Sequence, residues 1–190
     1  MLFSPGLLGP RGVTLMFDTI WNNIFRNRTK SESQVIDFLR AVPIFEGLTD
    51  AELHTIESKV YVRHYADGER IFKEGDPSLG MYIVMSGAVN ILRQVPDGPP
   101  QLLATLTGGD FFGEIGLIDD APRSATAVAY GKTEAIGFFK PDFMSLIHAK
   151  PGLGVKVVVR LAKTLSARLR RTNEELRQFH LKHQQEARAL

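Results

Sequence analysis

The stretch from Phe111 to Ala129, FFGEIGLIDDAPRSATAVA, carries the most information about the fold and the function of this 190-residue chain. Glu114 follows a glycine, and Arg123 comes nine residues later. Gly113 allows a tight turn, so a short helix can begin at Glu114 with its first N–H groups unpaired. Such N–H groups favour an anion, and a guanidinium matches phosphate oxygens. The carboxylate of Glu114 suits a hydroxyl donor such as a ribose, so the two side chains together indicate a nucleotide.

This stretch resembles the phosphate-binding cassette of the cyclic nucleotide-binding domain family, which includes protein kinase A regulatory subunits, cyclic-nucleotide-gated channels and bacterial catabolite activators. The matching residues are FGEIGLI and PRSATAVA at the family's spacing, together with GDPSLGMYIVMSGAVNI at 75–91. The resemblance covers roughly residues 42–171. It implies that Glu114 accepts a hydrogen bond from the ribose 2′-hydroxyl and that Arg123 pairs with the cyclic phosphate. Many members carry alanine at the position of Gly116, and glycine should loosen the short helix slightly.

The resemblance also implies further ligand contacts. It places Gly113 and Ile115 against the ribose phosphate, and it gives Ser124 and Ala125 hydroxyl and backbone N–H contacts with the phosphate. The run around Thr172 resembles the dimer helix of catabolite activators, which closes over the purine from one subunit or from its partner. For Thr172 itself, a place in the helix seam without ligand contact is an equal alternative. The predicted ligand-binding residues are Phe112, Gly113, Glu114, Ile115, Gly116, Arg123, Ser124, Ala125, Arg168, Thr172 and Asn173.

The expected ligand is cyclic AMP, with cyclic GMP as the second choice. The arginine-serine step and the Arg-x-x-x-Thr-Asn run look most like the cyclic-AMP-binding activators, whereas members that favour cyclic GMP often carry threonine at the position of Ser124. No cofactor is expected.

Hydrophobic periodicity predicts a mainly β fold with flanking helices. Short β-rich runs between Val60 and Phe139 are separated by turn signals that include Ser86-Gly87 and Gly131-Lys132. About eight strands at this spacing favour an eight-stranded β-sandwich or jelly-roll barrel. Helices are expected at 33–42, after a capping box at Thr49, at 142–148 and, as one long helix, at 153–188. We expect three regions: an N-terminal extension at 1–30, the barrel domain at 31–150 and a lid and dimerisation helix at 151–190.

Two apolar stripes lie outside the predicted barrel. In the long helix, residues 162, 165, 169, 172, 176, 179 and 183 alternate spacings of three and four, the pattern of a coiled-coil seam, and this predicts a homodimer through 158–183. In the extension, Phe17, Ile20, Trp21, Ile24 and Phe25 form a helical stripe before a basic cluster. We expect that stripe to pack on its own domain or a partner subunit, and the alternative is weak peripheral membrane contact through 17–30.

Composition excludes several function classes. Without cysteine the chain has no disulfide and no thiolate chemistry, which fits a cytoplasmic location, and no apolar run approaches the ~20 residues of a membrane-spanning helix. The five histidines are scattered, so no metal site is predicted, and no hydrolytic arrangement of side chains is recognisable. We therefore expect no enzyme. Residues 151–190 carry nine Lys or Arg and three Glu, a net charge of +6 that leaves −4 for residues 1–150.

The resulting hypothesis is an intracellular cyclic AMP receptor whose C-terminal helix moves toward a partner, an unknown effector protein, when ligand binds. A helix-turn-helix like that of the catabolite activators is not expected after the long helix, so sequence-specific DNA binding is not expected either. The alternative is a scaffold or anchoring module with a vestigial pocket. Non-specific nucleic-acid binding by the basic helix is a third hypothesis.

Overall fold

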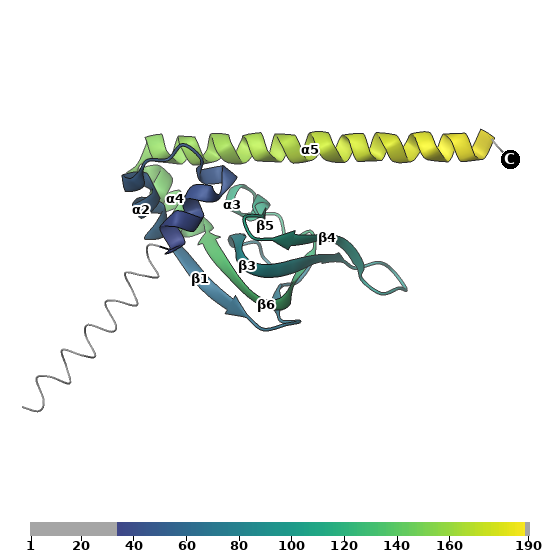
Figure 1. Ribbon diagram of the computed structural model, residues 1–190, viewed down its shortest axis with the longest axis horizontal. Helices are drawn as coiled ribbons and strands as arrows, with labels where there is room; N and C mark the ends of the chain where they lie inside the picture. The colour runs from purple at the N-terminus through teal and green to yellow at the C-terminus, as the bar shows by residue number, and fades with distance from the viewer. Residues whose placement is uncertain (1–33, 189–190) are drawn as a thin grey trace, which may run out of the picture.

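The computed structural model of the chain describes residues 34–188 (Figure 1). A curled antiparallel sheet has helices gathered at one end and one long helix running along it. Residues 34–41 are helical, and the later elements are η1 (Pro43–Phe45), α2 (Asp50–Glu57), β1 (Val60–Tyr65), β2 (Arg70–Phe72), β3 (Gly80–Arg93), β4 (Gln101–Thr107), β5 (Phe111–Phe112), α3 (Ile115–Ile118), β6 (Thr126–Phe139), α4 (Lys140–Ala149) and α5 (Pro151–Arg188). The predicted mainly β fold with flanking helices is confirmed, and the predicted helical stripe at 17–25 lies outside the described residues.

Two strands of fourteen residues, β3 and β6, form the centre of a six-stranded sheet. The strand order is β1-β6-β3-β4, with β2 paired to β6 and β5 paired to β3. The central pair runs antiparallel from Gly80 opposite Phe139 to Leu92 opposite Thr126. The other four strands pair with this central two-stranded unit, and the sheet curls into a roll.

The expectation of eight strands is wrong by two for the described residues, because two predicted turns are irregularities inside strands. The β3–β6 register shifts on both sides of Ser86, Gly87 has a φ of +76°, and Gly131 in β6 has a φ of +73°. A glycine with positive φ suits a β-bulge as well as a turn, and a bulge increases the local twist. The long strands can therefore bend round the roll without ending.

The described residues contain two hydrophobic clusters. The larger one packs the sheet against the helices and includes Phe138, Ile136 and Phe143. The smaller one lies inside the roll, where Val84, Val89, Phe112 and Ala127 are buried and Ile71, Phe72, Tyr82, Ile91 and Leu106 pack against them. Several residues of this second cluster, Phe72, Ile91, Leu106 and Phe112, form the apolar floor of a cavity described below.

Helix boundaries follow local signals. The predicted capping box is present, since the Thr49 N–H donates to Glu52 Oε2 at 2.8 Å and the Glu52 N–H donates to Thr49 Oγ at 3.4 Å. The helices predicted at 142–148 and 153–188 are separated in the structure by Lys150 alone, and α5 begins at Pro151, where proline suits the first helical turn. None of the described helices is long and apolar enough to span a membrane.

The long helix α5 presents two different faces. Leu153, Val157 and Leu161 are buried against the domain, and a Cβ at Gly154 would lie only 2.8 Å from Ile147 Cγ1, which keeps α4 and α5 close. The C-terminal end of α5 projects beyond the sheet (Figure 1). Along its length α5 exposes Val155, Val158, Leu169, Leu176 and Phe179.

Candidate functional site

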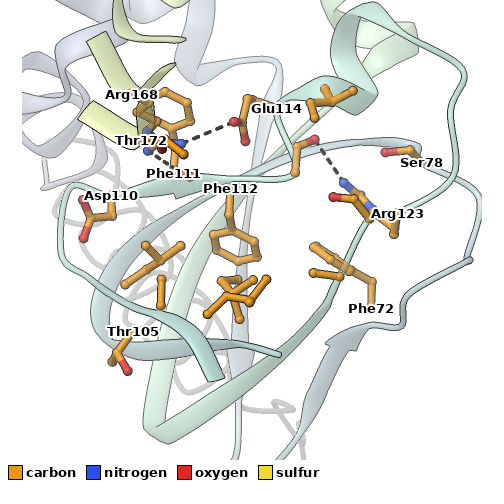
Figure 2. Close-up of a pocket in the computed structure, with 18 of the residues that line it drawn as sticks. Phe72, Ser78, Thr105, Asp110, Phe111, Phe112, Glu114, Arg123, Arg168 and Thr172 are labelled. Carbon is orange, nitrogen blue, oxygen red and sulfur yellow. Dashed lines mark hydrogen bonds and ion pairs between the residues drawn. The ribbon is translucent and has the colours of Figure 1, made fainter. Parts of the chain in front are cut away.

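A cavity of about 740 Å³ lies between the curled sheet and α5 (Figure 2). Five segments line it: the end of β2 and the loop after it, Ile91 of β3, strand β4, strand β5 with the residue before it and the loop that leads to β6, and about two turns of α5. Of the predicted ligand-binding residues, nine line this cavity: Phe112, Gly113, Glu114, Ile115, Arg123, Ser124, Ala125, Arg168 and Thr172. Gly116 and Asn173 are not among its lining residues. The cassette loop and the long helix α5 therefore line the same cavity.

Arg123 is a buried cation at the sheet side of the cavity, with 6% of its surface exposed. Its Nη1 donates to the Gly113 carbonyl oxygen at 3.0 Å, and its guanidinium carbon lies 4.0 Å from the centroid of the Phe72 ring. Burial lowers the pKa of Arg123, because a low dielectric disfavours the charged form, although the charges of Tyr82, Asp76 and Glu114 act in the opposite direction. An arginine nevertheless stays protonated.

One donor of this guanidinium lacks a partner. Arg123 Nε is the buried side-chain nitrogen or oxygen without a hydrogen bond among the residues that the structure describes. A buried donor of a charged group costs free energy until an acceptor reaches it. An anion in the cavity would supply such an acceptor.

Position 113, next to the Arg123 guanidinium, requires glycine for two reasons. Its φ of +70° lies in the left-handed region, where a side chain is strained. A Cβ at this position would also overlap Arg123 Nη1 and lie 3.2 Å from its Cζ. The close approach of the loop to the guanidinium therefore requires glycine.

Glu114, at the other side of the cavity, meets a second arginine that comes from α5. Arg168 Nη1 lies 3.3 Å from Glu114 Oε1, Arg168 Nη2 donates to the Phe111 carbonyl oxygen at 2.9 Å, and the guanidinium stacks 4.0 Å from the centroid of the Phe111 ring (Figure 2). The Glu114 side chain is 13% exposed. Its Oε2 has no protein partner within the described part of the chain and can accept a hydrogen bond from a ligand.

Gly116 is part of the cassette but lies behind the cavity. It follows Ile115 in the one-turn helix α3, its N–H donates to the Gly113 carbonyl oxygen at 3.1 Å, and its Cα faces Ser78. Asn173 lies on the exposed surface of α5. Both remain predictions as ligand-binding residues.

Sequence reasoning missed thirteen residues that line the cavity: Phe72, Ser78, Ile91, Leu103, Ala104, Thr105, Leu106, Asp110, Phe111, Ala121, Pro122, Arg171 and Glu175. Most come from strands that pairing alone brings beside the cassette. Arg171 and Glu175 follow one and two helical turns after Arg168 and pair with each other at 3.0 Å, so the 3.6-residue period of the helix could have found them. Phe72 carries no local signal of a role, and Ser78 lies in the run at 75–91 that resembles the family, but nothing in that run singles it out.

No group of three or more His, Asp or Glu side chains that could hold a metal occurs among the residues described. The cavity is instead lined by three guanidiniums (Arg123, Arg168 and Arg171), three carboxylates (Asp110, Glu114 and Glu175), hydroxyl groups and apolar side chains. This combination suits a small anionic ligand that also carries hydroxyl groups and an apolar or aromatic part.

Comparisons with known proteins agree with this chemistry. Residues 62–150 match the family described as cyclic nucleotide-binding domain. The cyclic AMP receptor protein of Thermus thermophilus is 37% identical over 138 residues, which cover 73% of this chain and 62% of that protein. The chain spans about three fifths of the length of the curated relatives it matches first.

Two solved structures extend the likeness to the fold. A cyclic nucleotide-binding domain from Methylobacillus flagellatus superposes with a TM-score of 0.68 at 26% identity, over 77% of this chain and 82% of that one. The regulatory domain of Toxoplasma gondii PKA, solved with cAMP, superposes with a TM-score of 0.63 at 27% identity, over 73% of this chain and 51% of that one.

Proposed function

Because this chain belongs to the cyclic nucleotide-binding domain family, a family of regulatory rather than catalytic proteins, we propose that it is a receptor for a cyclic nucleotide, most specifically cyclic AMP. The observation that carries the proposal is the position of Arg123 and Glu114 at two sides of one cavity of about 740 Å³. They differ in charge and can therefore bind the two unlike parts of one ligand. A cytoplasmic location stays a prediction.

In the proposed complex the cyclic phosphate pairs with Arg123, whose free Nε gains an acceptor. Ser124 and the backbone around Ala125 add contacts on the same side. Glu114 accepts the ribose 2′-hydroxyl on Oε2, while Oε1 stays with Arg168. A carboxylate already held by a cation needs little reordering when the ligand arrives, and such preorganisation favours affinity.

The base would lie between β4 and α5. Leu103 and Leu106 provide apolar surface, and Thr172 and Arg171 close the cavity from the helix. The preference for cyclic AMP over cyclic GMP rests on Ser124 and on the resemblance of the Arg168–Asn173 run to cyclic-AMP-binding activators.

We propose that the signal leaves the site through the distal part of α5. Leu153, Val157 and Leu161 are at most 4% exposed, and exposing them would cost roughly 5–9 kcal/mol in total at about 1.5–3 kcal/mol for each side chain. Typical coupling free energies are only about 1–3 kcal/mol. We therefore propose that the part of α5 that moves begins after Leu161 and includes Arg168, which contacts Glu114. The helix does not pivot at the break beside Pro151.

Hydrogen exchange tests this step. Cyclic AMP should increase the protection of amides at 166–182 and leave 153–161 unchanged. Equal changes in both segments would contradict a distal signal.

We also propose that the chain forms a homodimer through α5. The exposed Val155 and Val158 continue the predicted seam toward the N-terminus by one heptad, in phase with Leu169, Leu176 and Phe179. Leu165 is half-buried against the domain core, so it would contribute less to the dimer than the seam pattern suggests. The effector protein is not identified by this surface, and the three-region division at 1–30, 31–150 and 151–190 also stays a proposal.

Calorimetric titration with cyclic AMP and cyclic GMP tests the receptor. Binding at micromolar concentration or below should fall at least about 30-fold in Arg123→Ala, because removing a charge-assisted contact costs about 2–5 kcal/mol. Glu114→Gln should weaken binding less. Arg63→Ala is the matched control, since Arg63 is exposed on β1 and does not line the cavity. Absence of binding heat with both nucleotides would refute the receptor and support the scaffold with a vestigial pocket.

A further inference from the structure

Ser78 lies in the loop between β2 and β3 and lines the cavity on the side of Arg123 (Figure 2). It is half-buried, and its hydroxyl makes no hydrogen bond to any residue that the structure describes. Every other polar side chain that we place at the phosphate end comes from the cassette loop. Ser78 reaches the same place from a different segment.

The hydroxyl of Ser78 occupies space that only a glycine at 116 leaves open. A Cβ on Gly116 would overlap Ser78 Oγ, and it would also lie 2.9 Å from Ser78 Cβ and 3.3 Å from the Gly80 nitrogen. The family resemblance leads us to expect alanine at this position, with a small effect on the one-turn helix. The structure gives the glycine a steric reason, which is the presence of Ser78.

The Ser78 hydroxyl has no protein partner within the described residues but is accessible to solvent, so it can bond to water in the ligand-free chain and to a ligand that displaces this water. Ser78 lies on the same side of the cavity as the Arg123 guanidinium, where an anion would lie (Figure 2). A serine hydroxyl can donate one hydrogen bond to a phosphate oxygen and does not repel it.

We propose that Ser78 is a further ligand-binding residue, whose hydroxyl donates to one exocyclic oxygen of the bound cyclic phosphate, and that Gly116 provides the space for it. The inference rests on the proposed binding of a cyclic nucleotide. It assigns a phosphate contact to the β2–β3 loop that the cassette alone does not contain.

The first test compares affinities for cyclic AMP. Ser78→Ala should weaken binding about tenfold, because the hydroxyl bonds to a charged acceptor. Ser86→Ala is the matched control: Ser86 is exposed, donates to Glu134 at 3.3 Å, and does not line the cavity. It should bind like the unmodified chain.

The second test separates a phosphate contact from a packing effect. The two phosphorothioate diastereomers of cyclic AMP carry sulfur on one or the other exocyclic position. The unmodified chain should distinguish them by a larger affinity ratio than Ser78→Ala does, since a hydroxyl donates poorly to sulfur. A purely structural role would change both affinities equally and leave the ratio unchanged.

The third test uses the steric pair. Gly116→Ala should lower the melting temperature, whereas the double variant with Ser78→Gly and Gly116→Ala should recover it without recovering the affinity. If the unmodified chain binds cyclic AMP and Ser78→Ala binds equally well with the same diastereomer ratio, the inference about Ser78 is overturned and the receptor stands. If the unmodified chain binds no cyclic nucleotide, the proposed function is refuted, and the inference with it.

Discussion

Gly113→Ala tests how the cassette holds its arginine. The φ of +70° at Gly113 costs an alanine about 1–2 kcal/mol. The new methyl would overlap Arg123 Nη1, and since Arg123 is 6% exposed it has little room to move within its pocket. The guanidinium would have to leave its position between Gly113 and Phe72.

The cost of that displacement follows from the two contacts that it breaks. The hydrogen bond from Arg123 to the Gly113 carbonyl oxygen involves a charged donor and contributes about 1.5–3 kcal/mol. Stacking on Phe72 at 4.0 Å contributes about 0.5–2 kcal/mol. Allowing for rehydration of the displaced cation, we expect Gly113→Ala to lower the free energy of unfolding by about 3–5 kcal/mol and to abolish binding of cyclic AMP.

Gly131→Ala is the matched control because its φ of +73° is nearly the same and nothing lies within 4 Å of a Cβ there. Urea denaturation should give a loss of about 1–2 kcal/mol for this variant, from backbone strain alone. In an Arg123→Ala background, the cost of Gly113→Ala should fall to that of the control. Equal losses for the two glycine variants in the unmodified background would refute the reasoning.

Four further changes probe the site and the assembly. Arg168→Gln should weaken cyclic AMP binding about tenfold, because Glu114 loses the cation that holds it; unchanged calorimetric affinity would restrict Arg168 to packing. Leu169→Asp should give a monomer in sedimentation, and an unchanged mass would disprove the dimer seam. Burial raises the pKa of Tyr65 to about 12, so the folded state favours the neutral phenol. The free energy of unfolding should therefore be highest below pH 10 and should decline between pH 10 and 12, by about 1 kcal/mol after solvent screening. Denaturant titrations of Tyr65→Phe should lack this decline. Arg123→Met should leave the melting temperature of the ligand-free protein equal or higher while binding is lost, and a large drop in that temperature would show that the buried cation stabilises the fold.

The cassette could be predicted because its chemistry is local in sequence. Glu114 and Arg123 lie in one loop, and the glycine between the strand and the short helix marks the turn. The strand count failed at Gly87 and Gly131, because positive φ is compatible with a hairpin turn and with a bulge, and only pairing between β3 and β6 distinguishes them.

Residues brought to the cavity by long-range pairing could not be predicted. Phe72 reaches Arg123 only because β2 pairs with β6 beside the loop, and Ser78 reaches Gly116 only because α3 folds back over the start of β3. Neither contact could be predicted from local residue spacing, since the two residues of each pair lie about 40–50 residues apart in the chain. The partner of Arg168 was also missed: helical periodicity placed it on α5, but nothing local indicated that it faces a carboxylate.

The buried arginine connects stability with binding. A guanidinium with one unpaired donor is a poor choice for stability, because the lost hydration of Arg123 is returned only in part by Gly113 and Phe72. An anion completes the missing contact, so the residue that stabilises the ligand-free state less than an apolar side chain would is also the one that favours the ligand-bound state. On the other wall, the Arg168–Glu114 pair joins α5 to the site. A ligand that bonds both Arg123 and Glu114 therefore favours the arrangement in which the helix is held against the sheet, and it can shift that equilibrium only by the difference in contacts between the two states.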